Sequence, residues 1–570
     1  MQRLTILTLF LLSGSAALIY QIVWVRQATL VFGVSIYAYS TVLAAFMGGA
    51  ALGSYALGNW ADRVKSPLRS FALLQICIAL LGALAPSALL ALMPTYAALA
   101  RTVAADPVSI TAVRTFFSIL VLAPPTFLIG ATLPLMARAF TRQPGRVGSD
   151  VGQLYAADTL GAAVGCALAG LVLLRLLGTQ ATVFVAVALN AIAAVGAWLL
   201  ARRPSPQQDA SFTQKKPPSR PAQSAKLRPQ NPTRLEQIGP GFVLAAYTLS
   251  GFAALGYEIV WARILTVFTL DAVFSFAIML TTFLTGLTLG GWLGAWWTRR
   301  QRVTTAHFAN VQIAIGLATL LTLFIFAWLP NRVTLETTLG GYSVINGILF
   351  EFLLGFLTLL LPTTLLGLLF PLVTSIYTGE STAAVGAGVG RIYAWNTAGA
   401  VLGSLIVGFG LIPLLGLQAT AASLSVLNLI IGVVASWLPT AHAGSSRLIP
   451  QGGLALGIAL ILLLPARYYL GFRQGATDQM VYYGEGAETT VAVFDVKAEN
   501  FKVSFVNGRI EVPTDPLSMR AFRLLGHLPA LLQPDAERAL MLSFGNGIAT
   551  GSLDTHNIAR IDAVDLSAEQ

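Results

Sequence analysis

The chain has 570 residues, of which 56% are hydrophobic and only 10% are charged. Soluble globular domains carry roughly 25% charged residues, so this composition excludes an ordinary soluble protein. The formal net charge of +11 could suggest nucleic-acid binding. However, the basic residues gather where membrane proteins place them, in loops and a linker on one side of the bilayer. We therefore expect an integral, multi-pass membrane protein that contacts the lipid bilayer and binds no nucleic acid.

Taken in chain order, the apolar segments form two sets of six. Runs of about 20 apolar residues are long enough to cross a bilayer as helices. The first half has six such runs, at about 4–32, 36–59, 70–99, 110–139, 151–176 and 180–200. The second half has six more, at about 241–269, 272–297, 306–329, 343–377, 388–413 and 417–438, and an extra run at about 452–466 follows. The first run is too long for a signal peptide, so we predict a retained helix.

The two sets are copies of one pattern. The segment SGSAALIYQIVWVR, which ends at Arg26, returns as SGFAALGYEIVWAR, which ends at Arg263. The same register relates further glycines and helix-breaking prolines: Gly49 to Gly286, Gly53 to Gly290, Pro125 to Pro362 and Pro134 to Pro371. One residue later in register, LGTQAT returns as LGLQAT. An even number of spans per copy predicts parallel repeats, which is the pattern of the major facilitator architecture.

A basic, Pro-rich segment separates the repeats and helps to orient them. Residues 202–238 contain too few apolar side chains to fold, which predicts a linker. Three loops on the same side carry clusters of basic residues: Arg63, Lys65, Arg69, Arg138, Arg142, Arg146, Arg299, Arg300 and Arg302. The positive-inside rule then places the N-terminus and the linker in the cytoplasm.

The predicted domains are a first six-helix repeat, the linker, a second six-helix repeat, an extra apolar segment with a connector, and a C-terminal domain. Their boundaries are 1–201, 202–238, 239–440, 441–475 and 476–570.

Polar residues inside the predicted spans mark a candidate site, because a charge there costs about 2.5–3.5 kcal/mol on insertion scales. Glu258 stands where the first repeat has Gln21, and Asp158 stands where the second has Asn396. The predicted polar site consists of Tyr20, Arg26, Asp158, Tyr257, Glu258 and Arg263. It could bind a charged solute, with Glu258 as a cation or proton site. Alternatively, Glu258 and Arg26 could form a structural ion pair between the repeats.

Two further features have structural interpretations. Tyr20 and Tyr257, with the tryptophans four residues later, could instead belong to the aromatic belt at the membrane interface. Cys77 and Cys166 lie inside predicted spans without a metal-binding spacing, so we predict no metal site.

The composition changes after about residue 475. Alternating segments at 489–496 and 501–506 and the Asn507-Gly508 turn predict β-hairpins, and a helix is expected at 518–532. A strand then leads into a glycine turn and helix, and a second strand ends at Asp565. This order is typical of Rossmann-type nucleotide sites, in which the glycines let the backbone approach the ligand and the acid accepts hydrogen bonds from ribose. The predicted cofactor-binding residues are Gly545, Asn546, Gly547, Gly551 and Asp565.

The chain resembles the spermidine/spermine synthase group, and more closely its bacterial membrane-fused branch. The resemblance rests on the Tyr483-Gly-Glu485-Gly486 segment, the Asn-Gly-Arg hairpin, Leu524-Leu-Gly-His-Leu-Pro529, the Gly545-x-Gly547 turn and the repeated membrane motifs. It implies a multi-pass protein of the bacterial inner (plasma) membrane. It also implies aminopropyl transfer from decarboxylated S-adenosylmethionine to an amine or polyamine acceptor.

The chain departs from that family at the residues that carry its chemistry. The family's Gly-Gly-Gly-Asp-Gly turn reads Ser543-Phe-Gly-Asn-Gly547, and its Tyr-His-Glu cluster aligns with Ala521-Phe-Arg523. The acidic catalytic segment would lie beyond Gln570, so no catalytic residue is predicted. Three functions are therefore considered: a membrane-bound aminopropyltransferase-like enzyme, a transporter of cationic or amine solutes with a degenerate nucleotide-binding regulatory domain, and an S-adenosylmethionine-dependent methyltransferase.

Overall fold

The computed structural model describes most of the chain. The described residues are 2–32, 36–103, 107–143, 145–202, 234–269, 272–328, 344–379, 382, 384–438, 448–464, 478–486 and 489–565. Most of the predicted linker and most of the connector before the C-terminal domain therefore lie outside the described residues.

Twelve long helices form the bundle within the described residues, six from each repeat. The first repeat supplies α1 (Gln2–Phe32), α2 (Ile36–Arg63), α3 (Pro67–Thr102), α4 (Pro107–Phe140), α5 (Val147–Leu168) and α7 (Gly178–Arg202). The second repeat supplies α8 (Arg234–Thr269), α9 (Ala272–Arg300), α10 (Thr305–Trp328), α12 (Val344–Thr378), α13 (Val385–Ile406) and α14 (Ile412–Ser436). The prediction that the first apolar run is a retained helix is consistent with α1, which packs inside the bundle.

Eleven candidate membrane spans are found among the described residues. The last of them runs from Val385 to Ser436, which is too long for one crossing. It breaks at Gly416, whose φ of 81° is left-handed, so it comprises two of the predicted spans. A mostly helical, multi-pass membrane protein is thus confirmed.

The duplication extends to irregular features of the backbone. A five-residue π-helix, Ala169–Leu173, follows α5, and another, Val407–Leu411, follows α13. Each precedes a left-handed glycine, Gly178 with φ 73° or Gly416 with φ 81°. A short helix, α6 (Leu174–Leu176), completes this corner in the first repeat. Since side chains disfavour positive φ, the repeated glycine explains why both copies of the LGxQAT motif turn at the same point.

Close helix packing is also repeated. In the first half α1 packs on α5, and in the second half α8 packs on α13. A Cβ on Gly161 would overlap the carbonyl oxygen of Leu11, and one on Gly399 would overlap that of Thr248. Gly161 and Gly399 are related by the same register as the LGTQAT and LGLQAT segments, and the structure gives both the same packing role.

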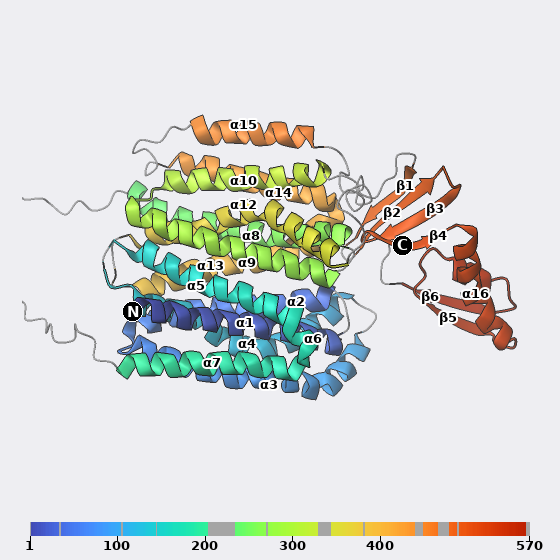
Figure 1. The fold of residues 1–570 in the computed structure, drawn as a ribbon, viewed down its shortest axis with the longest axis horizontal. Helices are drawn as coiled ribbons and strands as arrows, with labels where there is room; N and C mark the ends of the chain where they lie inside the picture. Colours follow the sequence, from blue (N-terminus) through green and yellow to red (C-terminus); the bar gives the residue numbers. More distant parts are fainter. Residues whose placement is uncertain are drawn as a thin grey trace, which may run out of the picture.

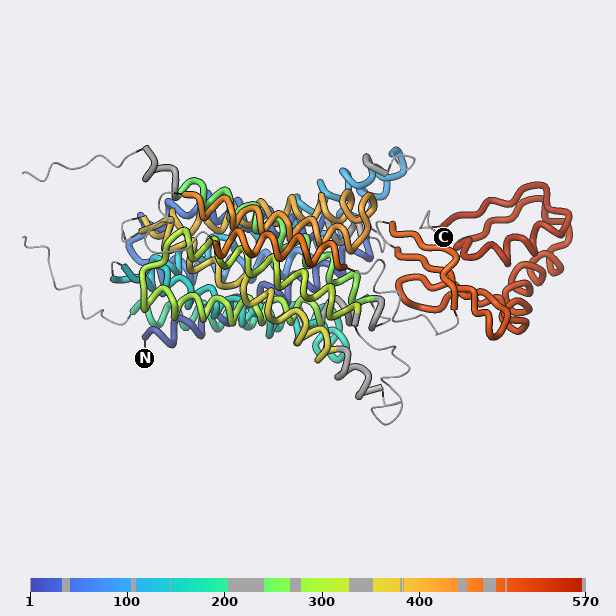
Figure 2. The backbone as a smooth tube through the Cα atoms, turned by 90° about the horizontal axis from the view of Figure 1, so that it is seen from above, coloured from blue at the N-terminus to red at the C-terminus, as the bar shows by residue number. Residues whose placement is uncertain are grey.

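The two halves lie side by side with their helices roughly parallel to one axis (Figure 1). The N-terminus, the end of α7 and the start of α8 lie at one end of the bundle, which we call the linker end. The C-terminal domain lies beyond the other end, which we call the sheet end (Figures 1 and 2). The extra apolar run forms α15 (Leu448–Leu463), which packs on α10 and α14 along the bundle. Together, these positions put the C-terminal domain on the opposite side of the bundle from the N-terminus.

The C-terminal domain contains two separate sheets in its described part. The strands β1 (Asp478–Glu485), β2 (Thr490–Val496), β3 (Phe501–Val506) and β4 (Arg509–Pro513) form an antiparallel meander, as the hairpin signals predict. After α16 (Pro516–Leu532), β5 (Arg538–Leu542) and β6 (Arg560–Val564) pair in parallel around α17 (Ile548–Leu553). A single parallel strand pair is not a Rossmann domain, so that part of the predicted fold class is not seen in the described residues.

The antiparallel sheet is attached to the second half of the bundle. Arg263, at the end of the repeated motif, donates hydrogen bonds to the Gly486 carbonyl at 3.3 Å and to the Thr490 hydroxyl at 3.1 Å. The Glu485 carboxylate accepts a hydrogen bond of 2.6 Å from the backbone N–H of Leu417. Leu417 begins the helix that follows the Gly416 break, and a carboxylate is favourable at a helix N-terminus.

Candidate functional site

The two halves contact each other closely at the linker end. There α2 packs on α13 across the boundary between the halves, and α5 packs on α9. A Cβ on Gly390 would overlap the carbonyl oxygen of Ser54, so α2 and α13 approach at backbone distance. The Asp62 carboxylate, at the end of α2, accepts hydrogen bonds from Gly386 N at 2.8 Å and Ala387 N at 2.9 Å. These groups hold the linker end of the boundary closed.

Further toward the sheet end, a central cavity of about 220 Å³ lies between the halves and is lined by α1, α2, α5, α8, α9, α12 and α13. On α5 the cavity begins at Tyr155, one turn beyond the close contact at Gly152, and on α13 it begins at Tyr393, one turn beyond Gly390. The polar lining residues come from both halves: Gln21, Tyr155, Asp158, Thr159, Tyr247, Ser250, Glu258, Tyr393, Asn396 and Thr397.

Two carboxylates line the central cavity, one from each half. Asp158 lies on α5 of the first repeat, and Glu258 lies on α8 of the second, with only 7% of its surface exposed. Within the described residues, neither carboxylate forms an ion pair, and the lining contains no Lys, Arg or His. A buried ionised carboxylate without a cationic partner is costly, so each group is stabilised either by taking up a proton or by a ligand that brings positive charge.

Each carboxylate has an amide at the equivalent position of the other repeat. Gln21 corresponds to Glu258 and Asn396 corresponds to Asp158, and all four side chains line the same cavity. The Oδ1 atom of Asn396 is buried without a hydrogen-bond donor. Because buried polar atoms usually have hydrogen-bond partners, this unpaired oxygen favours a ligand that donates a hydrogen bond.

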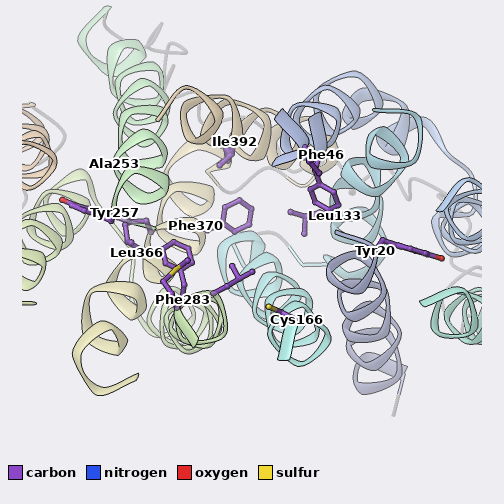
Figure 3. Close-up of a cluster of buried hydrophobic side chains, with 14 of the residues drawn as sticks. Tyr20, Phe46, Leu133, Cys166, Ala253, Tyr257, Phe283, Leu366, Phe370 and Ile392 are labelled. Atoms are coloured by element: carbon purple, nitrogen blue, oxygen red, sulfur yellow. The ribbon is translucent and has the colours of Figure 1, made fainter. Parts of the chain in front are cut away.

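Aromatic residues form another wall of the central cavity. The rings of Tyr155 and Phe370 lie 4.6 Å apart between centroids, and Tyr247 is 6.5 Å from Phe370. Figure 3 shows Phe370 near the middle of the bundle, between Phe46 of the first half and Phe283 of the second. Such faces can attract an organic cation in addition to the carboxylates.

The cavity tyrosines were missed in the sequence analysis, although a signal was present. Tyr155 and Tyr393 are repeat-equivalent and stand three residues before Asp158 and Asn396. This spacing places each pair on one face of a helix.

Tyr20 and Tyr257 do not line the central cavity, although they were assigned to the polar site. Each is fully buried within its own half and stacks on Trp24 or Trp261, with ring centroids 5.3 Å apart in both pairs. Their hydroxyl groups point away from the centre of the bundle (Figure 3). The Tyr20 hydroxyl accepts a hydrogen bond from Asn190 at 3.4 Å, and that of Tyr257 from Asn428 at 2.7 Å. The belt interpretation is wrong as well, since all four rings are buried.

The two arginines also lie outside the cavity. Arg26 is exposed near the sheet end and forms no ion pair with Glu258, and Arg263 contacts the C-terminal sheet. The predicted structural pair between Glu258 and Arg26 is therefore wrong. Of the six predicted membrane residues, the structure brings Asp158 and Glu258 together in one cavity.

The predicted nucleotide residues are engaged in internal contacts. The Asn546 side chain donates hydrogen bonds to the Ser504 hydroxyl and the Val512 carbonyl, both at 3.1 Å, and so ties the turn to the antiparallel sheet. The Asp565 carboxylate accepts hydrogen bonds from Phe544 N at 2.7 Å and Gly545 N at 3.1 Å. Asp565 thus binds the turn itself, where the prediction had it bind a ribose.

The glycines of this segment have different roles. Gly545 and Gly547 have positive φ values of 53° and 72°, as the predicted tight turn requires. Gly551 is exposed on α17, where an added Cβ would meet nothing within 4 Å. None of the five predicted cofactor residues is shown holding a nucleotide, so that assignment stays a prediction.

Comparisons with known proteins give similarity in structure alone. No protein-family model matches the chain, and no curated protein matches it. The human organic anion transporter MFSD10 is similar with 14% identity and a TM-score of 0.46, covering 76% of this chain and 99% of its own. The Escherichia coli fucose:proton symporter FucP has 13% identity and a TM-score of 0.41, covering 81% and 98%. The proton:xylose symporter XylE has 14% identity and a TM-score of 0.42, covering 78% and 98%. FucP and XylE are major facilitator superfamily transporters. Similarities this low do not indicate a substrate for this chain.

Proposed function

We propose that this protein is a membrane transporter of small organic cations, with its substrate site in the central cavity. The observation that carries the proposal is the pair of carboxylates, Asp158 and Glu258, in a cavity without a basic lining residue. An ammonium group donates hydrogen bonds to carboxylates at about 2.7–2.9 Å, and such charge-assisted bonds are roughly twice as strong as neutral ones. A primary ammonium group has three N–H donors, and the cavity offers the two carboxylates and the Asn396 acceptor as partners for such donors.

The position of the cavity supports movement of the solute as well as binding. It lies on the boundary between two repeats that are held together at the linker end by Asp62 and by glycine contacts. Rocking of one repeat against the other around a fixed central site is the usual route of alternating access. In this proposal, the described state is closed at the linker end, and transport requires the Asp62 contact to open.

Uptake of a labelled amine into proteoliposomes tests the proposal. We would compare putrescine, agmatine and choline as probes with the full 570-residue chain. The substitution Glu258→Gln should lower uptake at sub-saturating substrate about 10-fold or more, because a hydrogen bond to a charged group contributes about 1.5–3 kcal/mol. Uptake of none of these cations above protein-free vesicles would contradict the proposal.

A charge-relocation variant separates ligand binding from a structural role. The double substitution Glu258→Gln with Gln21→Glu moves the carboxylate to the repeat-equivalent position of the same cavity. If the carboxylate binds the solute, part of the lost uptake should return. If Glu258 serves only to pack α8, the double variant should be no better than Glu258→Gln alone.

Aminopropyl transfer has no comparable support. Asn546 and Asp565, the two predicted donor contacts with side chains, both bind protein groups. Binding of decarboxylated S-adenosylmethionine or S-adenosylmethionine at Gly545, Gly547 and Gly551 stays a prediction. The basic loops predict that the linker is cytoplasmic. The C-terminal domain lies at the opposite end of the bundle, which would then be outside the cytoplasm, where adenosyl donors are scarce. This placement argues against aminopropyl transfer.

A further inference from the structure

A second binding feature lies at the linker end, outside the central cavity. It is a groove of about 400 Å³ between α5 of the first repeat and α9 of the second, which we call the α5–α9 groove. Its walls include Ser149, Gln153, Trp292, Leu293, Trp296 and Arg299. The groove therefore crosses the boundary between the halves at the level where they are in contact.

The walls of the groove have the chemistry of a membrane interface. Trp292, Leu293 and Trp296 are 67%, 50% and 55% exposed, although they lie on a helix that is apolar enough to cross a membrane. Such side chains face lipid, and tryptophan is enriched at the level of the headgroups. The Ser149 hydroxyl and the Gln153 amide provide polar groups on the opposite wall.

Basic residues lie next to these tryptophans, at the C-terminal end of α9 and just after it. The Arg300 guanidinium lies 4.3 Å from the centre of the Trp296 ring. A neighbouring cavity of about 610 Å³ is lined by Arg299, Arg300 and Arg302, so Arg299 borders both cavities. Neither lining contains an acidic residue within the described part of the chain.

The nearest acidic residue on α5 offsets only part of this charge, because its carboxylate lies among Arg3, Arg146 and Arg299. Asp150 follows Ser149, but its carboxylate forms an ion pair with the Arg3 guanidinium at 3.2 Å. Arg299 and Arg300 are left facing the two cavities, and within the described residues no ion pair involves either of them. The site therefore combines an apolar groove open to lipid with an excess of positive charge at the headgroup level.

We infer that the α5–α9 groove binds an anionic phospholipid. The phosphate would contact Arg299 and Arg300, the ester region would meet Ser149 and Gln153, and an acyl chain would lie along Trp292 and Leu293. Basic pockets between membrane helices are suited to anionic headgroups. Because the groove joins α5 to α9, a bound lipid would stabilise the state in which the linker end is closed. This inference does not rest on the cation site.

Native mass spectrometry of the full chain tests the inference. The protein is reconstituted in phosphatidylcholine nanodiscs with or without phosphatidylglycerol, and the lipids retained after gentle release are counted. We expect selective retention of phosphatidylglycerol. Each juxtamembrane basic residue contributes about 1 kcal/mol, so the double substitution Arg299→Gln with Arg300→Gln should weaken retention about 30-fold.

Matched variants distinguish a specific lipid site in the α5–α9 groove from non-specific attraction of anionic lipids to the basic surface. Arg69→Gln removes an exposed arginine on the first turn of α3 that borders neither cavity, and it should leave retention unchanged. Trp292→Ala keeps every charge and should weaken retention several-fold through lost acyl-chain contact. Equal loss in Arg69→Gln and the double variant would overturn the inference. Displacement of the lipid by millimolar-range inorganic phosphate would overturn it too, because it would indicate a site for soluble anions.

Discussion

Glu258 and Gln21 occupy equivalent positions in the two repeats, and their side chains line the same cavity. Asp158 and Asn396 have the same relationship on α5 and α13. The duplication thus produced a symmetric frame, and divergence left one carboxylate in each half. The sequence repeat explains the matching arrangement of helices in the two halves. The positions at which the repeats differ include the two carboxylates of the proposed binding site.

The first prediction concerns the second acid-amide pair. Asp158→Asn should weaken cation binding about 10-fold or more, because it removes one of two charged acceptors. Adding Asn396→Asp should restore part of the affinity, since the new carboxylate enters the same cavity. Equilibrium binding of labelled putrescine to purified variants measures both changes. Unchanged affinity in Asp158→Asn would place the site elsewhere.

The second prediction concerns closure of the linker end. Asp62→Ala removes the acceptor for the backbone N–H groups of Gly386 and Ala387, so the population open at that end should rise. Spin-label distances between the linker ends of α2 and α13 would show a longer component. The neighbouring substitution Arg63→Gln is the control, since Arg63 is exposed and Asp62 makes the contact across the boundary. Identical distance distributions in Asp62→Ala and wild type would show that the contact does not hold this state.

The third prediction compares two buried hydrogen bonds related by the repeat. Asn428 donates to the Tyr257 hydroxyl at 2.7 Å, whereas Asn190 donates to that of Tyr20 at 3.4 Å. Asn428→Ala should lower the free energy of unfolding by about 1–3 kcal/mol, because it leaves a buried hydroxyl poorly satisfied. Asn190→Ala should cost less. Thermal unfolding of both variants in the same detergent compares their losses of stability. A larger loss of stability in Asn190→Ala than in Asn428→Ala would contradict the prediction.

The fourth prediction concerns attachment of the C-terminal sheet. Arg263→Gln weakens the hydrogen bonds to Gly486 and Thr490. Glu485→Gln removes the negative charge that accepts a hydrogen bond at the N-terminus of the helix beginning at Leu417. Both substitutions should increase hydrogen exchange in β1 and β2. Arg26→Gln, at the repeat-equivalent position, is the matched control because Arg26 makes no such contact. Equal protection in Arg263→Gln and Arg26→Gln would show that the sheet is held by other contacts.

Much of the fold could be predicted from the sequence, because its signals are local or repeated. The length of apolar runs predicts the helices, and the repeated LGxQAT segment marks both corners, where its glycine has a positive φ. The Asn507-Gly508 turn predicts the β3–β4 hairpin, which the structure contains. These features depend on residues close together in the chain or on a comparison of its two halves.

The features that sequence analysis missed depend on contacts between distant residues. Nothing near Asp62 indicates that it caps a helix more than 300 residues away, and its repeat partner is Arg299, so the symmetry gave no help. Burial of Tyr20 is equally hidden, because a tyrosine four residues before a tryptophan is compatible with a belt, a cavity or a core. Asp565 looked like a ribose acceptor until the structure showed it bonded to Phe544 and Gly545.

The central claim is that two carboxylates bind an organic cation in the cavity between the repeats. The most direct measurement is equilibrium binding of labelled putrescine, agmatine and choline to the purified chain and to the double variant Asp158→Asn with Glu258→Gln. The account predicts saturable binding of at least one cation to the wild type and loss of that binding in a double variant that remains folded. Equal binding by both proteins, or binding of none of the three cations, would contradict it.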